Sequence, residues 1–289
     1  SIEDLINMGF GMTDMKGVVN YLGTLGWSPK PDKLSSDILS MDDNSMITYL
    51  NKLGWEFTKN PEKSKINEIF SNNIINNYAY VMGNIIGECH DYFESLGGIK
   101  KIPEFFSLEE MIEKFDIHDV NKSAAQFDMK KLLHINGYWM ANIPLATFAD
   151  DFKSFIAKEY PDFNISESSL NAIIPSLPIR SKTFVEAYEM IKFLDNSLYL
   201  KNIEDKDLSN DITIVKSIIR DYYKLDLEDR KDNGILKIMK QYAENNNLKL
   251  KVVATSVRNV LTGQKISPPL HDVLDALDEK DIELKLNDD

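Results

Sequence analysis

The sequence predicts an all-α protein built from two or three consecutive helical bundles. Apolar residues recur at helical spacing along almost the whole chain, whereas strict apolar–polar alternation over several residues is rare. The 289 residues are enough for two ordinary domains, and a hydrophobic content of 43% supplies each with a core. We therefore expect helices whose apolar faces are buried against other helices.

The first helices can be located by the residues at their ends. A long helix is expected over about residues 75 to 96, because Gly97-Gly98 provides a stop. Ser107 and Glu110 have the spacing of a capping box, which starts the next helix. The face of that helix expected to be buried consists of Leu108, Met111, Ile112 and Phe115.

The C-terminal half of the chain shows the same pattern. Thr183 and Glu186 form a second capping box, ahead of a face made of Ala187, Met190, Ile191 and Leu194. A further apolar stripe consists of Val215, Ile218, Ile219 and Tyr222. Breaks between helices are expected around residues 142 to 144 and around the polar, acidic stretch at 201 to 210.

The last helix is expected to begin at Ser267. Ser267 can cap it, and Pro268 suits the first helical position. Its buried face would consist of Leu270, Val273, Leu274 and Leu277. Exposed N–H groups and the positive end of the helix dipole would make this start receptive to phosphates or to acceptor atoms of bases.

The charge of the chain is unevenly distributed. A formal net charge of −13 argues against nucleic-acid binding when it is averaged over the chain, because phosphate binding depends on Lys and Arg. The segment Leu248–Ile266, however, contains no acidic residue and four basic ones, namely Lys249, Lys251, Arg258 and Lys265. A locally basic segment therefore lies directly before the expected final helix.

Several classes of protein are excluded or disfavoured by composition. No apolar run approaches the roughly 20 residues of a membrane span, and the first ten residues carry no secretory signal, so the expected location is the cytoplasm. Cys89 is the only cysteine, which excludes an internal disulfide and a multi-thiolate zinc site. We expect no bound metal.

Searches for catalytic motifs find none in this chain. Phosphate-binding loops, dinucleotide-binding turns, metalloprotease helices and nucleophile elbows are all absent from the sequence. The run Glu88–Asp91 contains four potential ligands, yet neighbours on a helix point about 100° apart and do not converge on one ion. His118, His134 and His271 are isolated and are expected to be surface or capping residues.

Four stretches, taken together and in order, resemble the bacterial and organellar glutamyl-tRNA synthetase family. The start of the chain, "SIEDLINMGF" and "VVNYLGTLGWSP", is similar to the segment that follows the KMSKS loop of these enzymes. The stretch "FSLEEMIEKFDIHDVNKSAAQFDMKKLLHINGYWM" resembles a long central motif of the family, and "LPIRSKTFVEAYEMIKFL" resembles its arginine-containing helix start. Last, "VRNVLTGQKISPPLHDVLDAL" is similar to the family signature R-x-A-L-T-G-x-x-x-S-P-P-L-F-D-V-L, with His271 in place of Phe.

The resemblance implies a domain organisation for the chain. Residues 1–140 would be a helical stem-contact region with an unusual insertion at about 34–103, to which no family role transfers. Residues 141–208 and 209–289 would be two anticodon-binding helical subdomains. Neither the HIGH nor the KMSKS signature occurs, so the resemblance implies that the class I catalytic domain, with its ATP and Mg²⁺, lies outside this chain.

The resemblance also implies roles for five residues in binding tRNA. Arg258 resembles the arginine that contacts the first anticodon base, and Ser267, Pro268 and Leu270 resemble the residues that hold the middle base. Arg180 resembles the arginine that reads the third base. From spacing alone, Arg258 is better explained as a solvated charge and Ser267 as a cap, and only the resemblance favours function.

Two interpretations of function follow. The first is the tRNA-binding, anticodon-reading portion of a glutamate–tRNA ligase, inactive by itself, monomeric, and binding neither DNA nor a membrane. The second is a stand-alone tRNA-binding, RNA-binding or regulatory protein derived from the tail of such an enzyme, without enzymatic activity. A generic acidic interaction protein with a fortuitous resemblance is a third reading.

Overall fold

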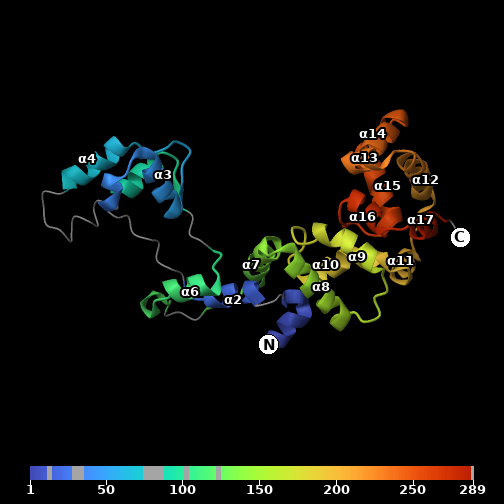
Figure 1. Cartoon of the computed structure of the whole chain (residues 1–289), viewed down its shortest axis with the longest axis horizontal. Helices are drawn as coiled ribbons and strands as arrows, with labels where there is room; N and C mark the ends of the chain where they lie inside the picture. The colour runs from blue at the N-terminus through green and yellow to red at the C-terminus, as the bar shows by residue number, and fades with distance from the viewer. Residues whose placement is uncertain (12–14, 28–35, 74–87, 101–103, 122–124, 288–289) are drawn as a thin grey trace. The chain divides into compact units, whose positions relative to one another are not determined.

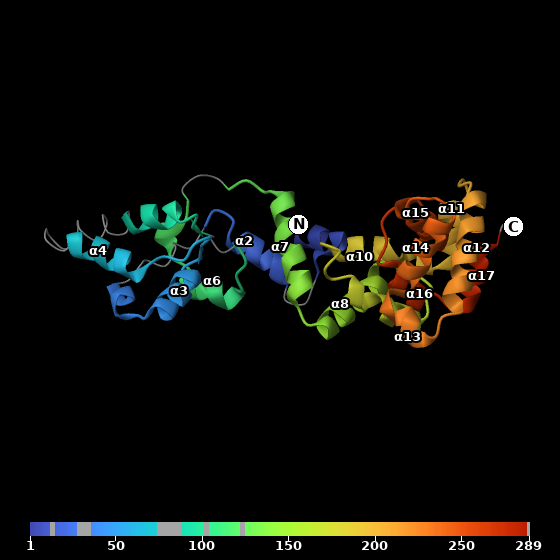
Figure 2. The ribbon, with the colours of Figure 1, turned by 90° about the horizontal axis from the view of Figure 1, so that it is seen from above.

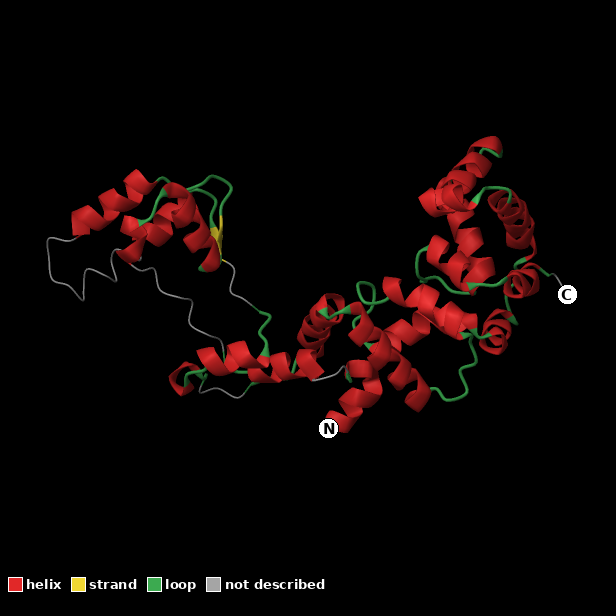
Figure 3. Cartoon of the chain, in the orientation of Figure 1, coloured by secondary structure: helices red, strands yellow, loops and turns green. Residues whose placement is uncertain are grey.

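The computed structural model describes residues 1–11, 15–27, 36–73, 88–100, 104–121 and 125–287. The chain forms two compact units (Figure 1). One unit comprises Ser1–Leu22 together with Asp128–Asp289, and the other comprises Gly23–Phe127. Helices dominate both units, as predicted, and the only strands among the described residues are β1 (Trp55–Glu56) and β2 (Ile99–Lys100), which pair antiparallel (Figure 3).

The larger unit is entirely helical over its described residues. Its α-helices are α1 (Ile2–Leu5), α2 (Lys16–Gly23, which ends at the boundary), α7 (Met129–Asn142), α8 (Leu145–Glu159), α9 (Glu167–Ile173), α10 (Phe184–Ile191), α11 (Asn196–Ile203), α12 (Ser209–Tyr223), α13 (Leu227–Asp229), α14 (Ile235–Asn245), α15 (Leu250–Thr262), α16 (Leu270–Ala276) and α17 (Glu279–Leu286). Short 3₁₀ or π turns complete it at Ile6–Phe10, Ile174–Ser176, Lys192–Leu194 and Arg230–Gly234. Figure 2 shows α12, α14, α15, α16 and α17 gathered at the C-terminal end of this unit.

One continuous apolar core runs through residues 140–282 of the larger unit. In α8, Phe148, Phe152 and Phe155 are spaced so that they face one way, and each lies 5.5–5.7 Å from the ring of Phe184 at the start of α10. The faces predicted for α10 and α12 are buried in this core, as is the face predicted for α16. The expected breaks at 142–144 and 201–210 are confirmed as the ends of α7 and α11.

The N-terminal segment is held to the larger unit by buried polar contacts. Trp139 in α7 donates its indole N–H to Asn20 Oδ1 over 3.0 Å, and the Asp128 N–H donates to the Tyr21 hydroxyl over 2.6 Å. Both Asn20 and Tyr21 are buried. Residues 1–22 are therefore an integral layer of this unit although more than a hundred residues separate them from α7.

The smaller unit has its own core. Its elements are the 3₁₀ turn Ser36–Ser40, α3 (Asp43–Lys52), β1, α4 (Lys63–Asn73), a helix at residues 88–95, β2, α6 (Leu108–Lys114) and the 3₁₀ turn Ile117–Asp119. The core consists of Ile38, Met46, Leu50, Leu53, Trp55, Ile66, Ile69, Phe70, Cys89 and Phe93. All of these residues fall within the range 34–103 that was expected to be an insertion, so this range has apolar core residues of its own.

Two expectations for helices of the smaller unit meet different outcomes. The long helix over 75–96 lies mostly outside the described residues, although 88–95 are helical and end at Gly97, whose φ is +69°. The capping box of Ser107 and Glu110 is present. The buried face predicted for α6 is wrong, because Met111 is buried while Leu108, Ile112 and Phe115 are 52–69% exposed. Helical spacing defines an apolar face but does not guarantee that a neighbouring element covers it.

Among the described residues, no helix has the length and apolar character needed to cross a membrane. The two compact units meet after Leu22 and after Phe127. The predicted subdomain boundaries at 140/141 and 208/209 are a separate division, which stays a prediction.

Candidate nucleic-acid interface

Arg258 lies on a helix whose inner face is buried in the core. It lies on α15, where Val257 and Leu261 are fully buried in the core. The helix is further fixed to α12 because Asp211 accepts hydrogen bonds from Ser256 (2.6 Å) and Asn259 (3.1 Å). Arg258 itself is half-buried, and its position along the surface is therefore set by a rigid helix.

The guanidinium of Arg258 is anchored by Ser267. Its Nε–H donates to Ser267 Oγ over 3.1 Å, and the Ser267 hydroxyl in turn donates to the Pro268 carbonyl over 2.9 Å. Nε is thus used within the protein. The terminal nitrogens of a guanidinium remain a planar fork of donors, a geometry suited to the edges of nucleobases.

The start predicted for the last helix is wrong by two residues, and the helix itself is followed by a further one, α17. α16 begins at Leu270, Pro269 occupies the N-cap position, and no side chain caps it. The physical reason is the Pro268-Pro269 pair, because a residue before proline is pushed into extended backbone and Pro268 is therefore kept out of the helix. Ser267, freed from capping, holds Arg258 instead.

The turn formed by Ser267–Leu270 has less solvent-exposed surface than expected. Ser267 is 9% exposed, Leu270 is 7% exposed, and Pro268 is also buried. These residues fix the backbone between α15 and α16 and pack against the core. The exposed apolar side chains are sequence neighbours of predicted site residues: Ile266, before Ser267, is 75% exposed, and Ile179, before Arg180, is 73% exposed.

The C-terminal end of α15 and the first residue after it are hydrogen-bonded to residues in and just after α11. The Tyr199 hydroxyl donates to the Val260 carbonyl (2.6 Å), while Asn202 Nδ2 (2.8 Å) and Lys206 Nζ (2.5 Å) both donate to the Gly263 carbonyl. Gly263 adopts φ +62°, and a Cβ there would meet Asn202 Nδ2 at 2.8 Å. Only glycine fits this helix end without displacing the clamp.

Arg180 lies on the turn between α9 and α10, and its side chain is exposed. It lines a cavity of about 600 Å³, together with residues of α10, Asn202, Lys206 and the loop Gly263–Ile266. The charged residues of this lining are the bases Arg180, Lys192, Lys206 and Lys265 and the acids Glu186 and Glu189. The cavity therefore carries an excess of two positive charges in a chain whose net charge is −13.

The Arg258 anchor lies next to the cavity along the chain, because Ser267 directly follows Ile266, which lines the cavity. Asp272 lies in the first turn of α16, and its pKa is raised by burial and by Asp275, against the lowering effects of His271, a Ser176 hydrogen bond and Arg180. The structure thus places Arg180 and the Ser267–Leu270 turn in one region of the larger unit.

Comparisons with known proteins give this region a family. Residues 147–287 match the family described as Anticodon binding domain. Glutamate–tRNA ligase 2 of Campylobacter curvus is 32% identical over a stretch that covers 63% of this chain and 39% of that ligase. The glutamate–tRNA ligase of Azorhizobium caulinodans is 30% identical, covering 72% of this chain and 45% of that ligase.

This chain is similar in sequence to the C-terminal part of glutamate–tRNA ligases. It spans less than half the length of the two ligases named above. A solved structure of the glutamate-tRNA synthetase from Elizabethkingia anophelis aligns with a TM-score of 0.54 and 16% identity, covering 94% of this chain and 39% of the synthetase. That likeness shows the fold. All five residues that sequence analysis singled out lie within the matched stretch 147–287.

Three residues near the predicted site residues were not singled out from the sequence. Ile179 and Ile266 each stand next to a predicted site residue and lie outside any helix, and Gln264 enters the wall of the cavity. Ile179 and Ile266 could have been found from the sequence, because each is an isoleucine that lies outside the apolar periodicity of a helix. Nothing in the sequence indicated Gln264, because its place depends on a contact with α10.

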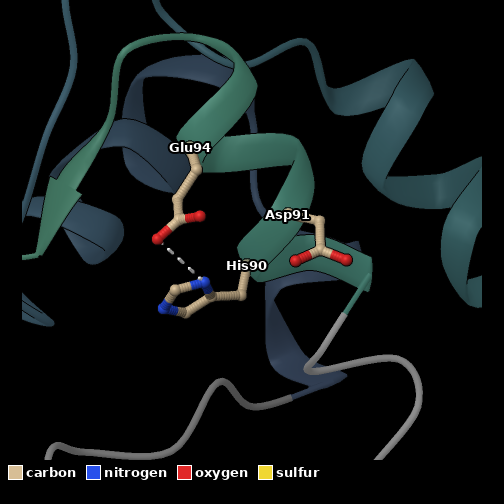
Figure 4. Close-up of side chains that lie close together, drawn as sticks. All are labelled: His90, Asp91 and Glu94. Atoms are coloured by element: carbon tan, nitrogen blue, oxygen red, sulfur yellow. Dashed lines mark ion pairs between the residues drawn. The ribbon is translucent and has the colours of Figure 1, made fainter.

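Among the described residues, histidine and acidic side chains also gather on the helix at residues 88–95. The ligand atoms of His90, Asp91 and Glu94 lie within 4.8 Å of one another among the described residues, and Figure 4 shows His90 facing Glu94. All three side chains are exposed to water, and His90 also packs edge-on against Trp55. Cys89, their neighbour, is buried, and burial raises the pKa of its thiol to about 12. We assign no metal to these exposed side chains on the helix at residues 88–95.

Proposed function

We propose that this chain is the tRNA-binding, anticodon-reading portion of a glutamate–tRNA ligase. The observation that carries the proposal is the match of residues 147–287 to an anticodon-binding family, because the anchored Arg258, the Ser267–Leu270 turn and the Arg180 cavity all fall inside it. Unpaired loop bases are recognised by guanidinium groups and by apolar surfaces on which they pack, and both are present here.

Each residue has a role in the proposal. Arg258 contacts the first anticodon base through the donors that Ser267 leaves unused. Ser267, Pro268 and Leu270 fix the backbone that holds the middle base, and Arg180 reads the third base. The proposed partner is a glutamate-accepting tRNA. The excess positive charge of the cavity favours binding of this polyanion, although the net charge of the chain is negative.

The proposal also covers cofactors, cellular location and oligomeric state. ATP and Mg²⁺ serve the amino-acid activation step of a complete ligase, and we propose that this chain binds neither. Aminoacylation for protein synthesis would place the protein in the cytoplasm. The chain is proposed to act as a monomer, with no DNA or membrane partner.

The test is the affinity of the chain for a glutamate tRNA transcript at fixed salt. Arg258→Ala is expected to weaken binding by about 1–3 kcal/mol, the scale for losing one good base contact. Arg220→Ala is the matched control, because Arg220 lies on α12 with its side chain 65% exposed and pairs with Asp221 at the surface. It removes the same charge and should change affinity much less.

Two results would count against the proposal. Equal weakening by the two substitutions would show that only net charge matters. Equal affinity for glutamate tRNA and an unrelated RNA of the same length would show that the anticodon is not read.

A further inference from the structure

The outward face of α15 carries a stripe of polar side chains that ends at Arg258. On the inward face, Val253 and Val260 are fully buried in the core. On the opposite face, Lys251, Thr255 and Arg258 follow one another at spacings of four and three residues, so they lie in one row along the helix. Lys251 and Thr255 are exposed and Arg258 is half-buried. The row therefore continues from the proposed anticodon contact toward the start of α15.

The row lies in the part of the chain that is free of acidic residues. No Asp or Glu occurs in the sequence between Glu244 and Asp272. Both Lys249 and Lys251, at the start of α15, are exposed, and the Lys251 ammonium has no ion-pair partner among the residues described. The acid of α12 that bonds to α15, Asp211, is already occupied by two hydrogen bonds from the flank of this helix. A local positive charge is thus available on a chain whose net charge is −13.

Exposed apolar side chains border the basic row. Leu248 is 40% exposed and Val252 is 48% exposed, and they are spaced four residues apart beside Lys251. An unpaired RNA strand presents phosphates along one edge and the faces of its sugars and bases along the other. A surface with cations beside apolar side chains matches both edges.

The direction of the row determines which part of an RNA loop can reach it. The Ser267–Leu270 turn and the cavity, to which the second and third anticodon bases are assigned, lie at the C-terminal end of α15, whereas Lys251 lies in its first turn. The strand that enters the anticodon from its 5′ side would therefore run from Arg258 toward Lys251. Seven residues separate these two, which is about 10 Å along a helix axis. A stacked strand advances about 3.4 Å per nucleotide, so this separation corresponds to about three nucleotides.

We propose that Lys251 binds a backbone phosphate of the anticodon loop on the 5′ side of the first anticodon base, within about three nucleotides of it. The inference rests on the proposed function. A phosphate carries no sequence information, so Lys251 would hold the loop in register for Arg258 without reading any base. Val252 would pack against a ribose or base of the same strand.

The first experiment measures affinity and its dependence on salt. A synthetic stem-loop with a glutamate anticodon is titrated with the full 289-residue chain, and binding is followed by fluorescence anisotropy. Lys251→Gln is expected to weaken binding about three- to fivefold at low salt, the upper range for an exposed ion pair. The slope of log Kd against log salt concentration should fall by about 0.7, the value for one phosphate contact on a single strand.

Two further variants and a second RNA assign this loss to one contact. Lys158→Gln is the matched control, because it removes the same charge from a side chain that is 66% exposed on α8, and it should leave affinity and slope unchanged. Lys251→Arg keeps the charge and should bind like wild type. A loop with a different first anticodon base should lose the same factor in Lys251→Gln, because the contact is independent of sequence.

The second experiment locates the phosphate on the RNA. Stem-loops are synthesised with one uncharged methylphosphonate linkage at each position of the loop in turn. Wild type is expected to lose about three- to fivefold in affinity at a linkage within about three nucleotides on the 5′ side of the first anticodon base. Lys251→Gln should show no further loss at that linkage, because its contact is already missing.

The outcomes separate this inference from the function on which it rests. Wild-type affinity in Lys251→Gln, an equal loss in Lys158→Gln, or the same methylphosphonate profile in wild type and Lys251→Gln overturns the role of Lys251. If Arg258→Ala still weakens binding of the glutamate loop in that case, anticodon reading stands. No binding of the glutamate loop by wild type overturns both proposals together.

Discussion

Lys285 on α17 is a buried charged residue that connects several helices of the larger unit. Its side chain is 1% exposed, its ammonium donates to the Phe193 carbonyl over 3.1 Å, and Nζ lies 3.5 Å from the ring centroid of Tyr199. Tyr199 in turn donates to the Val260 carbonyl on α15. One lysine therefore connects the last helix to the clamp behind the proposed anticodon site.

Burial has a measurable consequence for the titration of Lys285. It lowers the pKa of this amine to about 7, although Asp281 acts in the opposite direction. The unfolded chain then binds more protons than the folded chain between about pH 7 and 10.5, so stability rises with pH across that window. Relative to Lys285→Met, the free energy of unfolding of wild type should rise by about 2 kcal/mol between pH 6.5 and 9, measured by urea unfolding. A difference that is flat with pH would contradict this.

At the scale of helices, sequence patterns predicted which faces are apolar better than where each face packs. Thr183 caps α10 as expected, accepting from the Glu186 N–H, because capping depends on residues three apart in the sequence. The start of α16 was misplaced because Pro269 overrides the capping tendency of Ser267. The bond between Arg258 and Ser267 could not be predicted, because it depends on the path of the intervening turn.

The contrast between the two sides of α6 can be tested by substitution. Met111→Ala removes a buried side chain and should destabilise the smaller unit by about 2–3 kcal/mol. Ile112→Ala removes one that is 69% exposed and should change stability by less than about 0.5 kcal/mol. Urea unfolding followed by tryptophan fluorescence reports on this unit, because Trp27 and Trp55 both lie in it. Equal effects of the two substitutions would show that α6 is covered on both sides.

On the scale of the whole molecule, two separate cores support different parts of the chain. The matched residues 147–287 all lie in the larger unit, whereas residues between 38 and 93 build the other core. The sequence predicted the helical class, and the insertion expected at 34–103 stays a prediction. The sequence did not predict that this range has a core, because apolar spacing does not show which faces meet across 50 residues of chain.

The absence of nucleotide-binding motifs from the whole sequence leads to an expectation about activity. The isolated chain should not catalyse exchange of pyrophosphate with ATP in the presence of glutamate, Mg²⁺ and tRNA, because no phosphate-binding loop or HIGH or KMSKS signature is present to hold ATP. A complete glutamate–tRNA ligase assayed in the same buffer is the positive control. Exchange above background in a preparation free of other ligases would refute the assignment.

The concealed thiol of Cys89 makes this protein convenient to label. It is the only sulfhydryl in the sequence, it is fully enclosed, and its high pKa keeps it protonated and unreactive toward maleimides at neutral pH. A cysteine introduced at Ile266 would therefore be the one reactive position on the surface. A dye attached there would report the arrival of an RNA loop at the cavity without any change to the native cysteine.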